Sequence, residues 1–307
     1  MPYDHRKTSR RARPRTLALV LAATGCCAVL AGCGAPEVSP PGGKSAESPT
    51  ASRTTNGGAT TTAPAPQGSP TAGHGGPSVQ AGARTLAGRT VVIDPGHNSG
   101  NFRHSSEIDQ KVNIGTNRKE CDTTGTSTNG GYTEASFTLD VSRRLRELLT
   151  ARGAKVVLTH DADRAWGPCI DERAKIGNAA RADAVVSVHA DGSAVGHRGF
   201  HVILPARVRE GAADTAKIVG PSRELGERIA AQFARATGTA PANYLGSGTG
   251  LDVRDDLGGL NLSTVPKVFV ECGNMRDPKD AQLLTSAAWR QRAAQGIADG
   301  IATYLKG

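Results

Sequence analysis

The chain has 307 residues and a formal net charge of +9, and aromatic residues make up only 4% of it. Residues 1–32 carry six Lys and Arg residues against one acid, Asp4, and the remainder has 31 basic and 27 acidic residues. Because no later basic patch is interleaved with aromatic residues, this balance excludes nucleic acid as an expected partner.

The first 33 residues have the pattern of an export signal. A basic stretch to Arg15 precedes an apolar run, Thr16 to Leu30, which is too short to span a bilayer comfortably but suits a signal-peptide core. The run leads into Leu-Ala-Gly-Cys33, which resembles a bacterial lipobox in which Cys33 would carry a lipid and become the mature N-terminus. An ordinary cleaved signal, with Cys33 incidental, is the alternative. We expect an exported protein that contacts the membrane only through a lipid anchor at Cys33.

Residues 34–84 consist mainly of Pro, Gly, Ser, Thr and Ala, with almost no large apolar side chains. Such a segment cannot bury enough surface to offset the entropy lost on ordering, so it is predicted to be a disordered tether. One folded domain is expected over residues 85–307, which is long enough for a substantial core.

Short β-branched runs alternate with amphipathic patterns along this domain. Strands are predicted at Thr90–Asp94, Lys155–Thr159, Ala184–Val188, Phe200–Leu204 and Lys267–Val270. Helices are predicted at Glu134–Arg152, Ile170–Arg181, Ser222–Ala236 and Asp280–Leu305. Since most of these strands are apolar throughout, the predicted fold class is α/β, a single domain whose mostly parallel mixed sheet is covered by helices on both faces.

The cysteines outside the export segment are Cys121, Cys169 and Cys272. Outside the cytoplasm an odd number predicts one disulfide and one leftover thiol. Cys272 lies in an apolar strand pattern and is the expected buried thiol, whereas Cys121 and Cys169 lie in polar, turn-rich surroundings and are expected to pair. Cys121 belongs to a polar stretch, residues 98–131, that is too long for a simple connection and is expected to be either functional or disordered.

Three predicted strands lead into ionisable residues. His97 follows the first strand, His189 follows Ala184–Val188, and Glu271 follows Lys267–Val270. In open α/β sheets ligands bind beyond the carboxyl ends of the strands, so these side chains are expected in one crevice. Glu134 opens a helix on its apolar stripe, and a carboxylate on a buried face must be paired or bind a metal.

Two histidines with two glutamates are the donor types of a catalytic zinc site. Zinc commonly takes three protein ligands, including a His₂Glu set, and leaves the fourth position for a water whose pKa it lowers. The remaining glutamate would then act as general base. The other histidines of the domain are expected to be surface or packing residues rather than ligands, with His201 the one to check.

The combined motifs resemble the zinc-dependent N-acetylmuramoyl-L-alanine amidases of the type 3 family. They are Val-Val-Ile-Asp-Pro-Gly-His97, Glu134 at a helix start, Ser-Val-His189-Ala, and Pro-Lys-Val-Phe-Val-Glu271-Cys-Gly, and the resemblance covers about residues 89–305. It implies Zn²⁺ bound by His97, Glu134 and His189, with Glu271 as the catalytic acid/base. The reaction it implies is hydrolysis, by a zinc-activated water, of the amide that joins N-acetylmuramic acid to L-alanine.

Two positions depart from the family pattern, His160 where Arg is usual and Asn274 where Phe is usual, which leaves substrate preference less determined than the chemistry. A zinc peptidase that cuts within the stem peptide is the nearest alternative, and a non-catalytic wall-binding lipoprotein is the alternative from another class. The expected partners are peptidoglycan or muropeptides, and the protein is expected to be a monomer. The expected location is the outer face of the cell membrane, or the cell wall after secretion.

Overall fold

The computed structural model describes residues 85–307. The predicted signal segment, the lipobox at Cys33 and the tether over residues 34–84 lie outside the described residues. Within residues 85–307, no helix combines the length and the apolar character needed to cross a bilayer.

A six-stranded sheet with the order β4-β1-β5-β10-β6-β9 forms the centre of the domain. Strands β4, β1, β5 and β10 are mutually parallel, β6 is antiparallel to β10, and β9 is parallel to β6. The sheet is therefore mixed and mostly parallel, as predicted. The strand bounds are β1 Thr90–Pro95, β4 Lys155–Leu158, β5 Ala184–Asp191, β6 His201–Pro205, β9 Leu251–Arg254 and β10 Lys267–Asn274.

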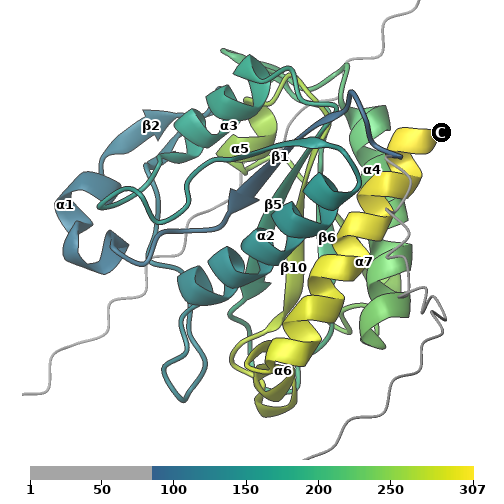
Figure 1. The fold of residues 1–307 in the computed structure, drawn as a ribbon. Helices are drawn as coiled ribbons and strands as arrows, with labels where there is room; N and C mark the ends of the chain where they lie inside the picture. The colour runs from purple at the N-terminus through teal and green to yellow at the C-terminus, as the bar shows by residue number, and fades with distance from the viewer. Residues whose placement is uncertain (1–84) are drawn as a thin grey trace, which may run out of the picture. The chain divides into compact units, whose positions relative to one another are not determined.

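Helices cover both faces of the sheet (Figure 1). On one face α2 (Glu134–Ala151), α4 (Val219–Thr237) and α7 (Ala287–Lys306) enclose the main hydrophobic core. On the other face α3 (Ile170–Ala179) packs near β1, and α5 (Gly258–Asn261) lies beside it. This arrangement confirms the predicted fold class.

Side chains alternate between the two faces of the sheet along the central strands, and the polar side chains near their carboxyl ends lie on one face. In β5, Val186 and Val188 belong to the main core, so Ser187 and His189 face the side of α3. Glu271 of β10 is paired in register with His189, so it faces the same side. The alternation of side chains along these strands therefore directs the valines into the main core and His189 and Glu271 to the opposite face.

The final helical stretch differs from its prediction. A single helix over Asp280–Leu305 is wrong, because the chain forms α6 (Pro278–Leu284) and then α7. Ser286 causes the break, since its side chain accepts a hydrogen bond from the Trp289 backbone N–H and caps the new helix. The edge strand β9 was not predicted.

The polar excursion over residues 98–131 is ordered. It holds a 3₁₀ turn at Asn101–Arg103, α1 (Ser105–Ile108), and a hairpin of β2 (Lys111–Asn113) and β3 (Arg118–Glu120). A second small hairpin pairs β7 (Arg209–Glu210) with β8 (Ala213–Asp214). In Figure 1, α1 and β2 lie to one side of the sheet.

The predicted disulfide between Cys121 and Cys169 is present, with an S–S distance of 2.08 Å, and Cys272 is a free, buried thiol. The bond ties the excursion to the start of α3. The Ile170 backbone N–H also donates to the Cys121 carbonyl, with an N···O distance of 2.7 Å. The excursion and α3 therefore meet at two points close to the carboxyl ends of the strands.

Candidate metal centre

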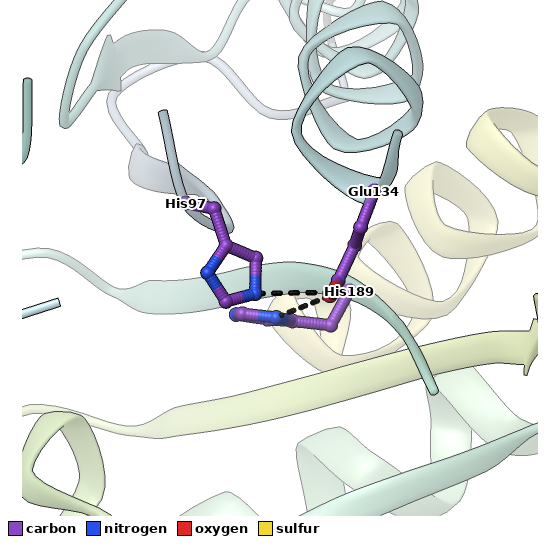
Figure 2. Close-up of side chains that lie close together, drawn as sticks. All are labelled: His97, Glu134 and His189. Carbon is purple, nitrogen blue, oxygen red and sulfur yellow. Dashed lines mark hydrogen bonds and ion pairs between the residues drawn. The ribbon is translucent and has the colours of Figure 1, made fainter. Parts of the chain in front are cut away.

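His97, Glu134 and His189 come together at the carboxyl ends of β1 and β5 (Figure 2). His97 Nε2 lies 3.2 Å from Glu134 Oε2, and His189 Nδ1 lies 3.0 Å from Glu134 Oε1. One potential ligand atom from each residue lies within 4.8 Å of the others. The two imidazole rings are nearly perpendicular, with their centroids 5.1 Å apart. The structure thus places three donors around one point, as the sequence predicted.

Two glycines make room for these side chains. A Cβ at Gly96 would lie 2.4 Å from the His189 ring. At Gly125, which has φ +72°, a Cβ would lie 2.7 Å from His97 Cδ2 and 2.8 Å from Glu134 Oε2. No side chain fits at either position without displacing a donor, so the backbone itself forms part of the wall of the site.

Glu134 is buried and fully satisfied by its surroundings. Beyond the two imidazoles, its carboxylate accepts from the Thr126 backbone N–H at 2.9 Å and from the Ala190 backbone N–H at 3.2 Å. Burial disfavours the charged form, but the two histidines outweigh it and hold the pKa of Glu134 well below its usual range. The carboxylate is therefore charged and fixed in place for a cation.

The second nitrogen of His97 faces a carbonyl and a carboxylate. Nδ1 lies 3.1 Å from the Thr123 carbonyl oxygen and 3.6 Å from Asp122 Oδ1. Such partners hold the proton on Nδ1 and leave Nε2 free to bind a metal. Burial opposes protonation of the ring, but Glu134 and Asp122 outweigh it and raise the pKa of His97 to about 10.

A buried ion network lies beneath His97. The Arg173 guanidinium donates to Asp94 Oδ1 at 2.8 Å, to Asp122 Oδ2 at 2.9 Å and to the His97 carbonyl at 3.1 Å. Lys267 Nζ lies 3.1 Å from Asp94 Oδ2. Burial of Asp94 is outweighed by these two cations, which hold its pKa far below the usual range. The network fixes both the backbone of His97, which has φ +62°, and its carboxylate partner Asp122.

Glu271 lies beside the three proposed ligands, but its carboxyl group forms no ion pair or hydrogen bond with them. Its side chain is partly exposed, while its Oε2 is buried and has no hydrogen-bond partner among the described residues. Burial raises the pKa of Glu271 well above its usual value, and the charges of Glu134 and Asp191 add to this effect. An unpaired carboxyl group of this kind can hold and release a proton at working pH.

His201 is the cross-strand partner of Glu271 on β6, and its Nδ1 is buried with no hydrogen-bond partner within residues 85–307. It is not part of the three-residue set, and its role as a packing residue rather than a ligand stays a prediction. The same is true of His104, which pairs with Glu107, and of His197, which lies flat against Tyr244.

The two departures from the family pattern both brace loops. His160 is buried with its Nε2 3.1 Å from the Pro95 carbonyl oxygen. The Asn274 amide nitrogen donates to the carbonyls of Ala194 and His197, and its oxygen accepts from the Ser193 backbone N–H. Both side chains therefore support the loops that border the centre.

A cavity of about 260 Å³ opens at His97 and His189. The Phe269 ring forms part of its wall and stacks on the His189 ring, with centroids 5.1 Å apart. Lys119 and Glu120 of β3 also line it, so the disulfide-bonded excursion borders the crevice.

Sequence reasoning missed several residues of this region. Asp122 and Gly125 gave no signal in the sequence, whereas Lys267 gave one that was not used. A buried lysine inside a strand pattern was the one available clue, since an unpaired charge there is costly. Its partner could not be inferred without knowing which strands are neighbours.

A His-Glu-His set beside an unpaired carboxyl group, at the carboxyl ends of a mostly parallel sheet, defines a metal-dependent hydrolase. The chain belongs to the amidase 3 family, described as N-acetylmuramoyl-L-alanine amidase, which matches residues 91–303. It is accordingly a peptidoglycan amidase that cleaves between N-acetylmuramic acid and L-alanine, and it acts outside the cytoplasm.

The chain is similar to characterised mycobacterial proteins. It is 42% identical over 229 residues to the N-acetylmuramoyl-L-alanine amidase Rv3717 of Mycobacterium tuberculosis, an alignment covering 74% of this chain and 91% of that protein. It is 42% identical to the crystal structure of the amidase Ami1 from Mycobacterium smegmatis, with a TM-score of 0.66 and coverage of 72% of this chain and 98% of that one. For Ami1 from Mycobacterium abscessus the identity is 41%, the TM-score 0.65, and the coverage 72% and 100%.

Proposed function

We propose that the metal is zinc, held by His97, Glu134 and His189, and that Glu271 is the catalytic acid/base. Two imidazole nitrogens and a carboxylate oxygen are a donor set that zinc takes at catalytic sites. The observation that carries the proposal is the convergence of one donor atom from each residue to within 4.8 Å. The family match supports the assignment, because it covers all four residues.

Zinc at this position would polarise the scissile carbonyl and lower the pKa of a water molecule. Glu271 accepts the proton of the attacking water and passes it to the leaving L-alanine nitrogen, for which a raised pKa is suited. Asp122 and Arg173 do not touch the reacting atoms. They hold the ring and the backbone of His97 so that its Nε2 keeps its direction.

Cleavage at the muramic acid amide is favoured over cleavage within the stem peptide because the family and its relatives are described as amidases of that bond. A non-catalytic wall-binding role is disfavoured by Glu271, because a binding protein has no need for an unpaired carboxyl group beside a metal site.

The test combines metal content with product analysis on purified peptidoglycan. The wild-type protein is expected to hold one zinc per chain and to release stem peptides with a free L-alanine amino group. His97→Ala is expected to lose both zinc and activity. Glu271→Gln is expected to keep zinc and to lose turnover by about 10²-fold or more. Glu107→Gln serves as the control, because Glu107 is partly exposed and pairs with His104 rather than with a residue of the centre.

Either of two results would overturn the assignment. Zinc at full occupancy in His97→Ala removes the proposed ligand set. Turnover near the wild-type rate in Glu271→Gln shows that another group moves the proton. Products cut inside the stem peptide would instead identify a peptidase.

We further propose that residues 1–33 are an export signal with a lipobox, that residues 34–84 are a tether, and that residues 85–307 are the catalytic domain. The support is the sequence pattern together with a substrate that lies outside the cytoplasm. A lipid on Cys33 is expected to place the native protein in the membrane fraction, and Cys33→Ala to release it or leave it unprocessed. Mass spectrometry that finds an unmodified mature N-terminus would contradict the anchor.

A further inference from the structure

A second cavity, of about 460 Å³, lies beside the metal centre and is lined mainly by the excursion. Asn98, Ser99 and Phe102 line one part of it, residues 124–127 another, and the start of α2 completes it. Gly125 lies between it and the centre, because it lines the cavity while a Cβ at this position would meet His97 and Glu134. We call this cavity the loop groove.

None of the side chains that line the loop groove ionises. The hydroxyl groups of Ser99 and Ser127 make no hydrogen bond to another group of residues 85–307 and so are available to a ligand, whereas the Thr126 side chain lies against Gly192. In contrast, the cavity beside Phe269 is lined by the charged side chains of Lys119 and Glu120, among others. The two cavities at one metal centre therefore offer different chemistry.

Phe102 lies at the edge of the loop groove with 66% of its surface exposed. The Arg103 guanidinium lies over the ring, 5.0 Å from its centroid, so the opposite face is the one available for stacking. Val195 and Val253 are also exposed, but neither lines a cavity at the centre, and single exposed apolar residues are ordinary. Phe102 differs because it lines a polar groove whose other walls include Asn98 and Thr133, the chain neighbours of two proposed metal ligands.

The segment that carries Phe102 is held rigidly. The Asn98 amide nitrogen donates to the Gly167 carbonyl at 3.0 Å, and the Asn101 amide nitrogen donates to the Thr123 carbonyl at 2.7 Å. The Gly167 backbone N–H donates to the Asn101 side chain at 2.9 Å. An aromatic ring on a fixed segment, beside free hydroxyl groups, is a preformed binding surface.

We propose that the loop groove is the glycan subsite of the enzyme and that Phe102 is its stacking platform. The proposal rests on the function above. When the amide between muramic acid and L-alanine lies at the metal, the sugar half of the substrate extends to one side of it and the stem peptide to the other. The sugar half is uncharged along its ring and presents hydroxyl and N-acetyl groups, and its C–H face packs on an aromatic ring. The stem half is the charged part of the substrate, and the cavity beside Phe269 is lined by charged side chains of both signs.

The test compares Phe102→Ala with Val195→Ala and Phe102→Trp in the zinc-loaded, full-length protein. One substrate is a long glycan strand bearing its stem peptides, and the other is a single N-acetylmuramoyl peptide. For Phe102→Ala we expect the KM for the long strand to rise about tenfold with kcat little changed. We expect the values for the single muramoyl peptide to stay within about twofold of wild type. Val195→Ala and Phe102→Trp are expected to behave as wild type.

A second measurement uses peptide-free glycan strands as inhibitors. They are expected to inhibit wild type and Phe102→Trp, and to inhibit Phe102→Ala about tenfold less strongly. Equal inhibition of all variants, or an equal rise in KM for both substrates, overturns the glycan subsite. Wild-type cleavage of both substrates is measured in the same experiment, so failure of the amidase assignment would be seen separately as an absence of free L-alanine amino groups.

Discussion

Gly125→Ala places a methyl group against two of the three proposed zinc ligands. The new Cβ would lie 2.7 Å from His97 Cδ2, whereas ordinary contacts begin at 3.4 Å, so the ring must move by about 0.7 Å. Ligand positions in metal sites are held to about 0.2 Å. A displacement of this size is therefore expected to weaken zinc binding by about 10-fold to 100-fold, the range seen when groups supporting ligands are altered.

The same substitution also strains the backbone, because Gly125 has φ +72° and an L-residue there costs about 1 kcal/mol. Gly131→Ala is the matched control, since Gly131 has φ +85° and a Cβ there would meet nothing within 4 Å. In the presence of chelator both variants are expected to lower the Tm by about 2–4 °C for each kcal/mol of strain.

The assay is zinc affinity by competition with a chelator, measured beside thermal unfolding of the metal-free proteins. Only Gly125→Ala should lose zinc affinity, while the two variants should share the loss of stability. If both variants bind zinc equally well, the methyl group is accommodated without moving the ligands and the reasoning about this wall of the site is wrong.

Three further outcomes follow from the buried groups. Arg173→Met leaves buried Asp122 without its cation and Asp94 with Lys267 alone, and is expected to lower the free energy of unfolding by about 3–5 kcal/mol in urea; a loss below about 1 kcal/mol would contradict the network. Replacing Cys121 and Cys169 by Ser removes a disulfide across a sequence separation of 48 residues, and should cost about 2–4 kcal/mol by the same measurement, with an unchanged midpoint the opposing result. Because the pKa of Glu271 is raised in the fold, the metal-free protein is favoured when this group is protonated. The contribution of Glu271 to stability is therefore fully present below pH 4.5, its ordinary pKa, and is lost as the pH rises through the folded-state pKa. Glu271→Gln should therefore stabilise the metal-free protein at alkaline pH but not in acid, and equal unfolding curves at both would refute the shift.

The sequence alone determined the layered fold and the identity of the residues that meet at the centre. Apolar strand runs followed by His97, His189 and Glu271 sufficed, because parallel strands deliver their carboxyl ends to one edge of the sheet. Glu134 could be added because a carboxylate on an apolar helix stripe needs a partner. The pairing of Cys121 with Cys169 followed from counting thiols and their surroundings.

The tertiary structure alone decided which groups support that centre. The Arg173 network joins residues from β1, α3, β10 and the excursion, and nothing in the local pattern of any one segment names the other members. The position of Gly125 against His97 depends likewise on how a loop closes over a strand end. Periodicity reports the direction in which a side chain points from its own element, whereas contacts between distant elements depend on register and loop path, which only the assembled fold fixes.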